Sequence, residues 1–333
     1  MKISTLLILF QLFCLTLVFG QAGSNKFEDF VPQLSTNTPI VWQAPTSQLP
    51  KSLWVYRRLL PRVFPAAVIS NAVVLASLQD KGIPQPSTNR TTIWVDHLES
   101  DPMPGCLTIN PDIASIGYSK GHLQQGSWEN VPDEKTVIQR AWNIARQLGL
   151  NPSQLMPKSV SSTICDYDDA GHANTNHQVC ERGLFMSRLL DGIDFWDDET
   201  EGFCVYFGSN AAIRSFGLTW PELRRDELRP VASPQQIIAC IRARKLTVLP
   251  DGKDGGNYFA RINSLSKAEK FTITKVTPYY KIGSFFETND LEMSKYDVPV
   301  AELEAVADFG TSNVAVRLFS PILAPDASRL LAK

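Results

Sequence analysis

Apolar residues follow a helical period most clearly between residues 137 and 148. They occur at i, i+4, i+7, i+8 and i+11, on one face of a helix, at Val137, Ala141, Ile144, Ala145 and Leu148. Asp133 and Glu134 suit the positive N-terminal end of such a helix, and Gly149 suits the position after its last turn. The pattern predicts an amphipathic helix that packs on a core.

Two further segments are predicted to be helical. Ser233-Pro234-Gln235-Gln236 has the form of a capping box, with Ser at the N-cap and Gln at N3. Ile237, Ile238 and Ile241 follow it as an apolar side. The stretch from Val68 to Leu78 is long and apolar enough for a buried helix.

Runs rich in β-branched and aromatic residues predict strands around these helices. Before residue 250 they cover 91–99, 106–109, 115–118, 184–190, 202–207 and 212–220. Asn110-Pro111-Asp112 and Gly208-Ser209-Asn210 are turn signals between neighbouring runs. A hairpin followed by a helix thus occurs twice, at about 91–149 and 184–245, which suggests a duplication.

The region after Pro250 has strand patterns at 271–281, 298–307 and 314–318, without a long helix. The predicted fold class is α+β: antiparallel sheets with helices packed on one face, two β-hairpin-plus-helix units and a β-rich C-terminal unit. The predicted organisation is a signal peptide at 1–20, an extended N-terminal arm at 21–50, α+β units at 51–150 and 151–250, and the β-rich unit at 251–333.

The first twenty residues have the pattern of a secretory signal peptide. Lys2 precedes an apolar run from Leu6 to Phe19, and Gly20 is a small exit residue. Gln11 interrupts the run and no basic cluster follows it, which favours a cleaved signal over a membrane anchor. We expect a secreted protein that has no membrane segment after cleavage.

Composition narrows the class of partner. The chain of 333 residues is 44% hydrophobic and 20% charged, as in folded globular proteins, and its formal net charge is −2. A nucleic-acid partner is not expected, because such proteins usually carry a basic face. The sequence contains neither G-x-G-x-x-G nor G-x-x-x-x-G-K-[ST], so no nucleotide cofactor is expected.

Cysteine usage fits export. Five cysteines remain after the signal, which allows two disulfides and one free thiol, at Cys106, Cys165, Cys180, Cys204 and Cys240. A Cys165–Cys180 disulfide is the first prediction, because the segment between them has loop composition. Asn89-Arg90-Thr91 is a sequon in a Pro- and Ser-rich stretch, which predicts glycosylation at Asn89.

Several short motifs together resemble modules of the PepSY type and a group of uncharacterised exported proteins that place such modules in tandem. The motifs are Leu148-Gly149-Leu150, Asp191-Gly192-Ile193, Leu218-x-Trp220, the APxQII-type segment 232–238, ITKVTPYY at 273–280 and AELEAVAD at 301–308. The resemblance covers about 91–323. It implies an antiparallel sheet packed against helices and a non-catalytic role in binding or inhibiting partners such as peptidases. It carries over no functional residue.

The segment from Cys165 to Cys180 contains candidate metal ligands, Asp168, His172 and His177. Imidazole and carboxylate groups would suit Zn²⁺. The five-residue spacing of the histidines fits no helical metal motif, and a disulfide-closed polar loop explains the composition better. No resident metal or other cofactor is predicted.

Candidate catalytic residues fall in two places. Asp191 and Asp194 begin an acidic cluster that continues to Glu201 and could supply an acid and a base, although a solvated hairpin tip explains it better. Ser119 lies in a G-x-S-x-G match, for which His97 is one possible base. A hydrolase elbow needs a helix directly after the Ser, and the following residues show no apolar stripe.

Aromatic residues are the remaining indication of a site. They could line a pocket for a small apolar molecule or fill the core, and comprise Trp196, Trp220, Tyr279, Tyr280, Phe285 and Phe286. The sequence therefore leaves two hypotheses. The first is a secreted binding or inhibitory protein that acts on a protein or peptide partner. The alternative is a cofactor-independent isomerase, cyclase or hydrolase with carboxylate acid/base residues.

Overall fold

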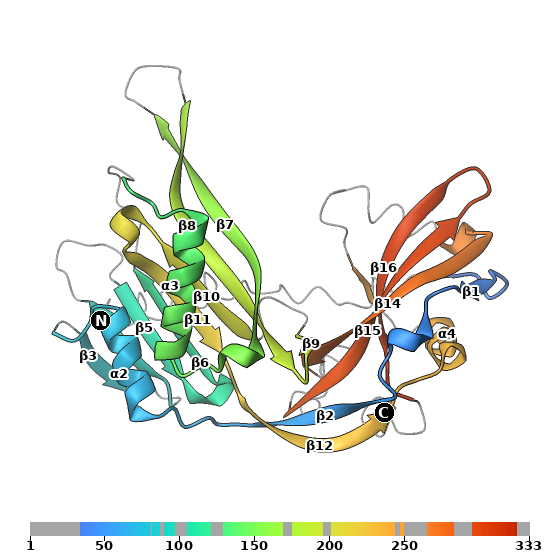
Figure 1. Ribbon diagram of the computed structural model, residues 1–333, viewed down its shortest axis with the longest axis horizontal. Helices are drawn as coiled ribbons and strands as arrows, with labels where there is room; N and C mark the ends of the chain where they lie inside the picture. Colours follow the sequence, from blue (N-terminus) through green and yellow to red (C-terminus); the bar gives the residue numbers. More distant parts are fainter. Residues whose placement is uncertain are drawn as a thin grey trace, which may run out of the picture. The chain divides into compact units, whose positions relative to one another are not determined.

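The computed structural model describes residues 34–80, 82–86, 90–96, 105–120, 129–168, 175–195, 201–243, 247–249, 265–282 and 295–324. These residues form two compact units. Unit 1 comprises Leu59–Glu222, and unit 2 comprises the described residues before and after it (Figure 1). Both units consist of antiparallel sheets with few helices, which confirms the mixed α and β class. Residues on the two sides of position 150, predicted to belong to separate units, share unit 1.

Unit 1 contains two helices and a sheet of nine strands among the described residues. Its elements are α2 (Ala66–Leu75), β3 (Gly82–Pro86), β4 (Thr92–Asp96), β5 (Gly105–Asn110), β6 (Ser115–Lys120), α3 (Glu134–Gln147), β7 (Leu155–Asp168), β8 (Thr175–Leu190), β9 (Ile193–Asp194), β10 (Gly202–Phe207) and β11 (Ile213–Thr219). The strand order is β3-β4-β5-β6-β11-β10-β8-β7, with β9 paired to β8. Short 3-10 turns lie at Pro111–Ile113, Pro152–Gln154 and Ser209–Ala211.

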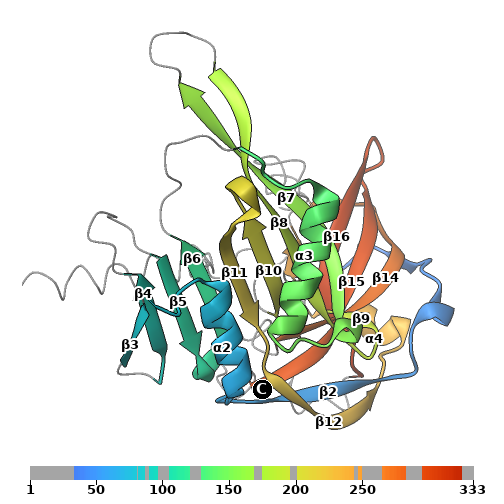
Figure 2. The same ribbon diagram turned by 60° about the vertical axis from the view of Figure 1, so that its left-hand side comes forward.

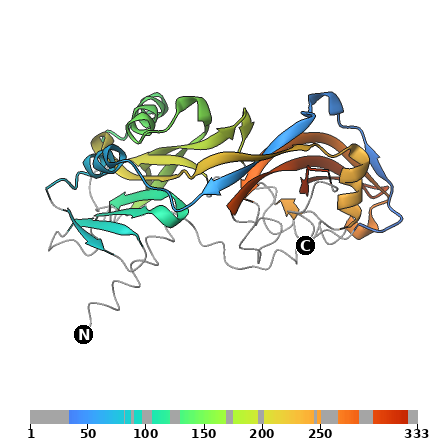
Figure 3. The ribbon, with the colours of Figure 1, turned by 90° about the horizontal axis from the view of Figure 1, so that it is seen from below.

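Both helices cover the same face of this sheet (Figures 2 and 3). The stripe predicted for α3 is buried, and the Asp133 side chain accepts a 2.8 Å hydrogen bond from the Thr136 N–H, so the helix and its N-terminal end are confirmed. The stripe packs on alternate residues of the central strands, among them Phe203 and Val205. No helix in the described part of the chain is long and apolar enough to cross a membrane.

The two halves of unit 1 follow the same path. Each consists of a helix and then four strands, α2-β3-β4-β5-β6 and α3-β7-β8-β10-β11, and the last strands, β6 and β11, pair at the centre of the sheet. The register places Gly117 opposite Gly217, inside the matching pentapeptides Ser-Ile-Gly-Tyr-Ser (115–119) and Ser-Phe-Gly-Leu-Thr (215–219). The sequence indicated a repeat here, but with the helix after the hairpin rather than before the strands.

The helix ends repeat as well. After α2 the left-handed residue is Ser77, with φ 57°, and after α3 it is Gly149, with φ 75°. In both, the N–H groups of that residue and the next donate 3.0 Å bonds back into the last turn: Ser77 to Val74, Leu78 to Val73, Gly149 to Arg146 and Leu150 to Ala145. These are the paired bonds of a Schellman motif, which closes both helices in the same way.

Strands β7 and β8 extend beyond the rest of the sheet as a two-stranded arm (Figures 1 and 2). β10 pairs with β8 only along residues 182–187, whereas β7 pairs with β8 as far as Asp168 and Thr175. The loop predicted between Cys165 and Cys180 is therefore wrong over residues 165–168 and 175–180, which are strand. A two-stranded ribbon beyond the rest of a sheet accepts polar residues, as a loop does, so composition alone does not separate the two.

Unit 2 contains one helix and seven strands of a sheet among its described residues. They are β1 (Ile40–Trp42), β2 (Ser52–Leu59), β12 (Glu222–Pro230), α4 (Pro234–Arg242), β13 (Thr247–Leu249), β14 (Lys270–Ile282), β15 (Tyr296–Asp308) and β16 (Asn313–Pro321), with 3-10 turns at Thr46–Gln48 and Leu265–Lys267. The main order is β1-β14-β15-β16-β13, β2 pairs with β15 and β12, and β1 is parallel to β14. The capping box of α4 is confirmed at Ser233 and Gln236.

Strand β12 lies in a segment rich in Arg and Glu for which the sequence predicted no strand. Eight of its nine residues are at least partly exposed, so neither face carries the alternation of a half-buried strand. The strand forms because it pairs with β2.

Candidate functional site

Of the predicted acidic pair, Asp191 lies in the turn between β8 and β9, and Asp194 lies on β9. Asp191 is exposed and has a left-handed backbone, with φ 51°. Asp194 uses both carboxylate oxygens, since one bonds to the Lys158 ammonium and the other accepts a 2.5 Å hydrogen bond from the Ser187 hydroxyl. These two contacts hold the Asp194 carboxylate in place and anchor β9 to β7 and β8.

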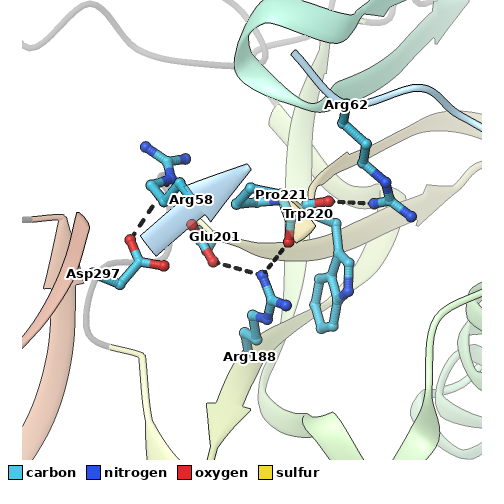
Figure 4. Close-up of polar contacts among 7 residues, drawn as sticks. All are labelled: Arg58, Arg62, Arg188, Glu201, Trp220, Pro221 and Asp297. Atoms are coloured by element: carbon cyan, nitrogen blue, oxygen red, sulfur yellow. Dashed lines mark hydrogen bonds and ion pairs between the residues drawn. The ribbon is translucent and has the colours of Figure 1, made fainter. Parts of the chain in front are cut away.

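Glu201, at the end of the acidic cluster, is fully buried beside Arg188 (Figure 4). Nη1 of Arg188 donates 2.9 Å bonds to Glu201 Oε2 and to the Pro221 carbonyl, and the guanidinium lies 4.4 Å from the Trp220 ring centroid. The pair thus ties β8 to the start of β10 and to the end of β11. Sequence reasoning missed Arg188, because nothing local links it to Glu201.

Arg62 supports the same end of unit 1 (Figure 4). Its guanidinium donates to the Trp220 carbonyl and lies 4.7 Å from the Phe64 ring centroid. Burial lowers the pKa of Arg62, Glu222 opposes this effect, and the charge of Arg188 adds to it. Within unit 2, the same figure shows Arg58 facing Asp297, 3.7 Å away.

Several residues that the sequence suggested for a site are not among those that the structure describes. His97, His172 and Asn89 are outside the described residues, as are Trp196, Phe285 and Phe286. Asp168, Cys165 and His177 are placed as backbone on β7 and β8, and their side chains are not described. No group of three or more His, Cys, Asp or Glu side chains that could hold a metal occurs in the described part of the chain.

Ser119 lies within β6. Its neighbours in the sheet are Cys106 on β5 and Ser215 on β11. The next helix among the described residues begins at Glu134, so the geometry differs from the strand-to-helix turn of a hydrolase elbow.

The described cysteines divide into two kinds. Cys106, Cys204 and Cys240 keep their thiols, and burial raises the pKa of the Cys204 thiol to about 11, which makes it a poor nucleophile at neutral pH. Cys180 is disulfide-bonded. The backbone register places Cys165 opposite Gln178, two residues from Cys180, and their pairing remains a prediction.

The described aromatics do not share one cavity. Tyr279 and Tyr280 are neighbours on β14, so they point to opposite faces. Tyr280 is buried and donates a 2.9 Å bond to the Trp54 carbonyl, whereas Tyr279 makes an edge contact with Phe319, and burial, then Glu302, raise its pKa. A shallow hollow of about 460 Å³ lies on the outer side of α3, lined by Gln139, Trp142, Asn143, Arg146 and Pro152.

β7 is an edge strand of the sheet in unit 1, and its exposed residues are mostly uncharged. β7 pairs with β8 and forms one end of the strand order. The register shifts between Pro157 and Ser159 and again between Thr163 and Ile164. Between these bulges lies a regular, uncharged stretch, Ser-Val-Ser-Ser-Thr at 159–163, which is exposed except for half-buried Val160. Ile164, beside it, is 60% exposed.

Each of the other described strands that pairs with a single neighbour carries a feature that opposes strand addition. β3 contains Pro84 and Pro86, six of the nine residues of β12 are charged, and β1, β9 and β13 are two or three residues long. Proline, charge and short length are the usual protections of a sheet edge. The stretch 159–163, which we call the β7 edge, lacks all three.

The chain was also compared with known proteins. No family model matches it, and no curated protein matches it. The resemblance to PepSY-type modules therefore stays a prediction.

Proposed function

We propose that this is a secreted binding protein that captures an extended segment of a protein or peptide partner along the β7 edge. The observation that carries the proposal is the contrast between this uncharged, regular, exposed edge and the other described strands with a single neighbour, which are short, charged or contain proline. Strand addition uses main-chain hydrogen bonds for affinity and side-chain contacts for specificity. The signal-peptide pattern supports export.

The expected strength of binding follows from the size of the edge. About half of the N–H and C=O groups of an edge strand point outward, so five residues offer about four to six hydrogen bonds. At about 1 kcal/mol each, they fall short of the roughly 8 kcal/mol that micromolar affinity requires. The partner therefore needs apolar side chains, and exposed Ile164 is positioned to meet one of them.

A peptide selection tests the proposal. Uncharged random octapeptides displayed on phage are selected on the mature protein, and hydrogen exchange is measured with the selected peptide. We expect protection of amides at 159–163 and none along β12. A Ser159→Lys, Thr163→Lys double variant should bind at least about tenfold more weakly, because charge on an edge opposes strand addition.

Leu228→Lys is the matched control. Leu228 is 50% exposed on β12, an edge that is already charged, so this lysine should leave peptide binding unchanged. The proposal fails if no peptide is selected, or if the selected peptides protect a different part of the chain.

The proposal also includes a duplication within unit 1, in which each copy has its helix before its strands, and a β-rich unit 2. The repeated helix ends and the matching strands β6 and β11 support it. We do not propose the enzymatic alternative, since Asp194 and Glu201 are engaged with Lys158 and Arg188.

A further inference from the structure

The helix-free face of unit 1's sheet carries one aromatic ring that lies flat. Gly183 on β8 pairs with Tyr206 on β10. A Cβ added to Gly183 would lie 2.4 Å from Cδ1 of Tyr206 and 2.6 Å from both Cγ and Cε1. Nearly equal distances to three consecutive ring atoms place that point over the ring plane rather than beside its rim. One face of Tyr206 therefore packs on the glycine, and the other faces away from the sheet.

Hydroxyl groups flank this ring along the same row of the sheet. The register runs Ser161–Gly183–Tyr206–Ser215–Ser119 across β7, β8, β10, β11 and β6. The Ser161 hydroxyl lies 3.4 Å from the Tyr206 hydroxyl. Ser161 is exposed, and Tyr206, Ser215 and Ser119 are half-buried. Because the other side chains of the row are small, they do not rise above the ring.

An ion pair also lies near the Tyr206 ring, because Glu181 is two residues before Gly183 on β8. Nε of Arg214 on β11 lies 3.3 Å from Oε1 of Glu181 on β8, and both side chains are less than one-fifth exposed. The pair adds donors and acceptors at fixed positions without net charge. The described row of the sheet is otherwise uncharged, so the chemistry of this surface suits a neutral ligand.

We propose that the Tyr206 ring, the hydroxyls of Ser161 and Ser215 and the Glu181–Arg214 pair form a subsite for one pyranose ring of a neutral oligosaccharide. A pyranose has a face of C–H groups, which stack on an aromatic face, and equatorial hydroxyls, which bond to groups around its rim. The flat ring supplies the first contact, and the serines and the ion pair supply the second. The subsite shares Ser161 with the β7 edge but lies on the face of the sheet, so a sugar bound there does not need an added strand.

Binding of neutral hexasaccharides tests this subsite. Cellohexaose, maltohexaose and chitohexaose are titrated into the mature protein, with saturation-transfer NMR and calorimetry as readouts. We expect at least one to bind. Tyr206→Ala should weaken that binding at least about tenfold, whereas Tyr206→Phe, which keeps the ring, should stay within about threefold. Trp142→Ala, on the helix-covered side, should not change it.

A second variant guards against misfolding of Tyr206→Ala. Ser161→Ala keeps the ring on Gly183 and should weaken binding about two- to fivefold. Thermal unfolding of each variant shows whether it is folded. The proposal is overturned if no hexasaccharide binds the wild type at millimolar concentration, or if binding is equal in the folded wild type, Tyr206→Ala and Ser161→Ala proteins.

Discussion

The two halves of unit 1 have the same order of helix and strands, but their outer edge strands differ. The first half ends outward in β3, five residues with two prolines, and the second in β7, fourteen residues with an uncharged central stretch. Their inner strands, β6 and β11, keep matching pentapeptides and pair at the centre of the sheet. The comparison indicates that core packing and strand pairing keep the central strands of a duplicated sheet alike, whereas its outer strands can diverge and acquire new functions.

The largest expected loss of stability comes from Arg188 in the second half, whose hydrogen bonds link β8 to the start of β10 and to the end of β11. Arg188→Leu leaves buried Glu201 without its cation and frees the Pro221 carbonyl, so we expect the unfolding free energy to fall by about 3–5 kcal/mol. Urea denaturation measures it. Lys158→Ala removes a more exposed pair with Asp194 and should cost about 1 kcal/mol or less. Equal losses would show that burial is not what distinguishes the pairs.

Substitutions at the C-terminal ends of α2 and α3 should change stability by a smaller amount. Gly149→Ala puts a Cβ on a residue with φ +75°, 3.2 Å from Cγ2 of Val68, and should cost about 1–2 kcal/mol. Ser77→Gly, at the equivalent position, should change stability by about 1 kcal/mol or less. Gly192→Ala is the control, because its φ is +79° and nothing lies within 4 Å of the added Cβ. If it costs more than Gly149→Ala, the contact with Val68 is not a source of the loss.

The smallest difference concerns the helix starts. Asp133 caps α3, whereas Pro65 before α2 makes no side-chain cap. Hydrogen bonds from Thr136 lower the pKa of Asp133, so its stabilisation is present above the unfolded pKa of about 3.9 and is lost as pH falls through the lower folded pKa. Asp133→Asn keeps a cap without this titration. The stability advantage of the wild type over Asp133→Asn should therefore shrink between pH 5 and pH 2, as followed by thermal unfolding. A constant difference would contradict the assignment.

The sequence predicted best what short segments determine. The α3 stripe with its Asp133 cap and the α4 capping box are local patterns, and both formed as expected. β7 and β12 were missed, because strands wet on both faces lack alternation. The Tyr206 subsite was beyond prediction, since the row from Ser161 to Ser119 joins five strands whose register only the folded sheet defines.

The division of the chain suggests an order of folding. Among the described residues, unit 1 is one continuous segment, whereas unit 2 draws on residues from both sides of it. Residues 40–42 must find 271–273, and β2 needs β12 and β15. As the polypeptide emerges from N- to C-terminus, unit 1 has all its strands before β14 exists. β1 and β2 pair only with strands that are synthesised much later, so we expect closure of the second sheet across this long loop to be slower than the folding of unit 1.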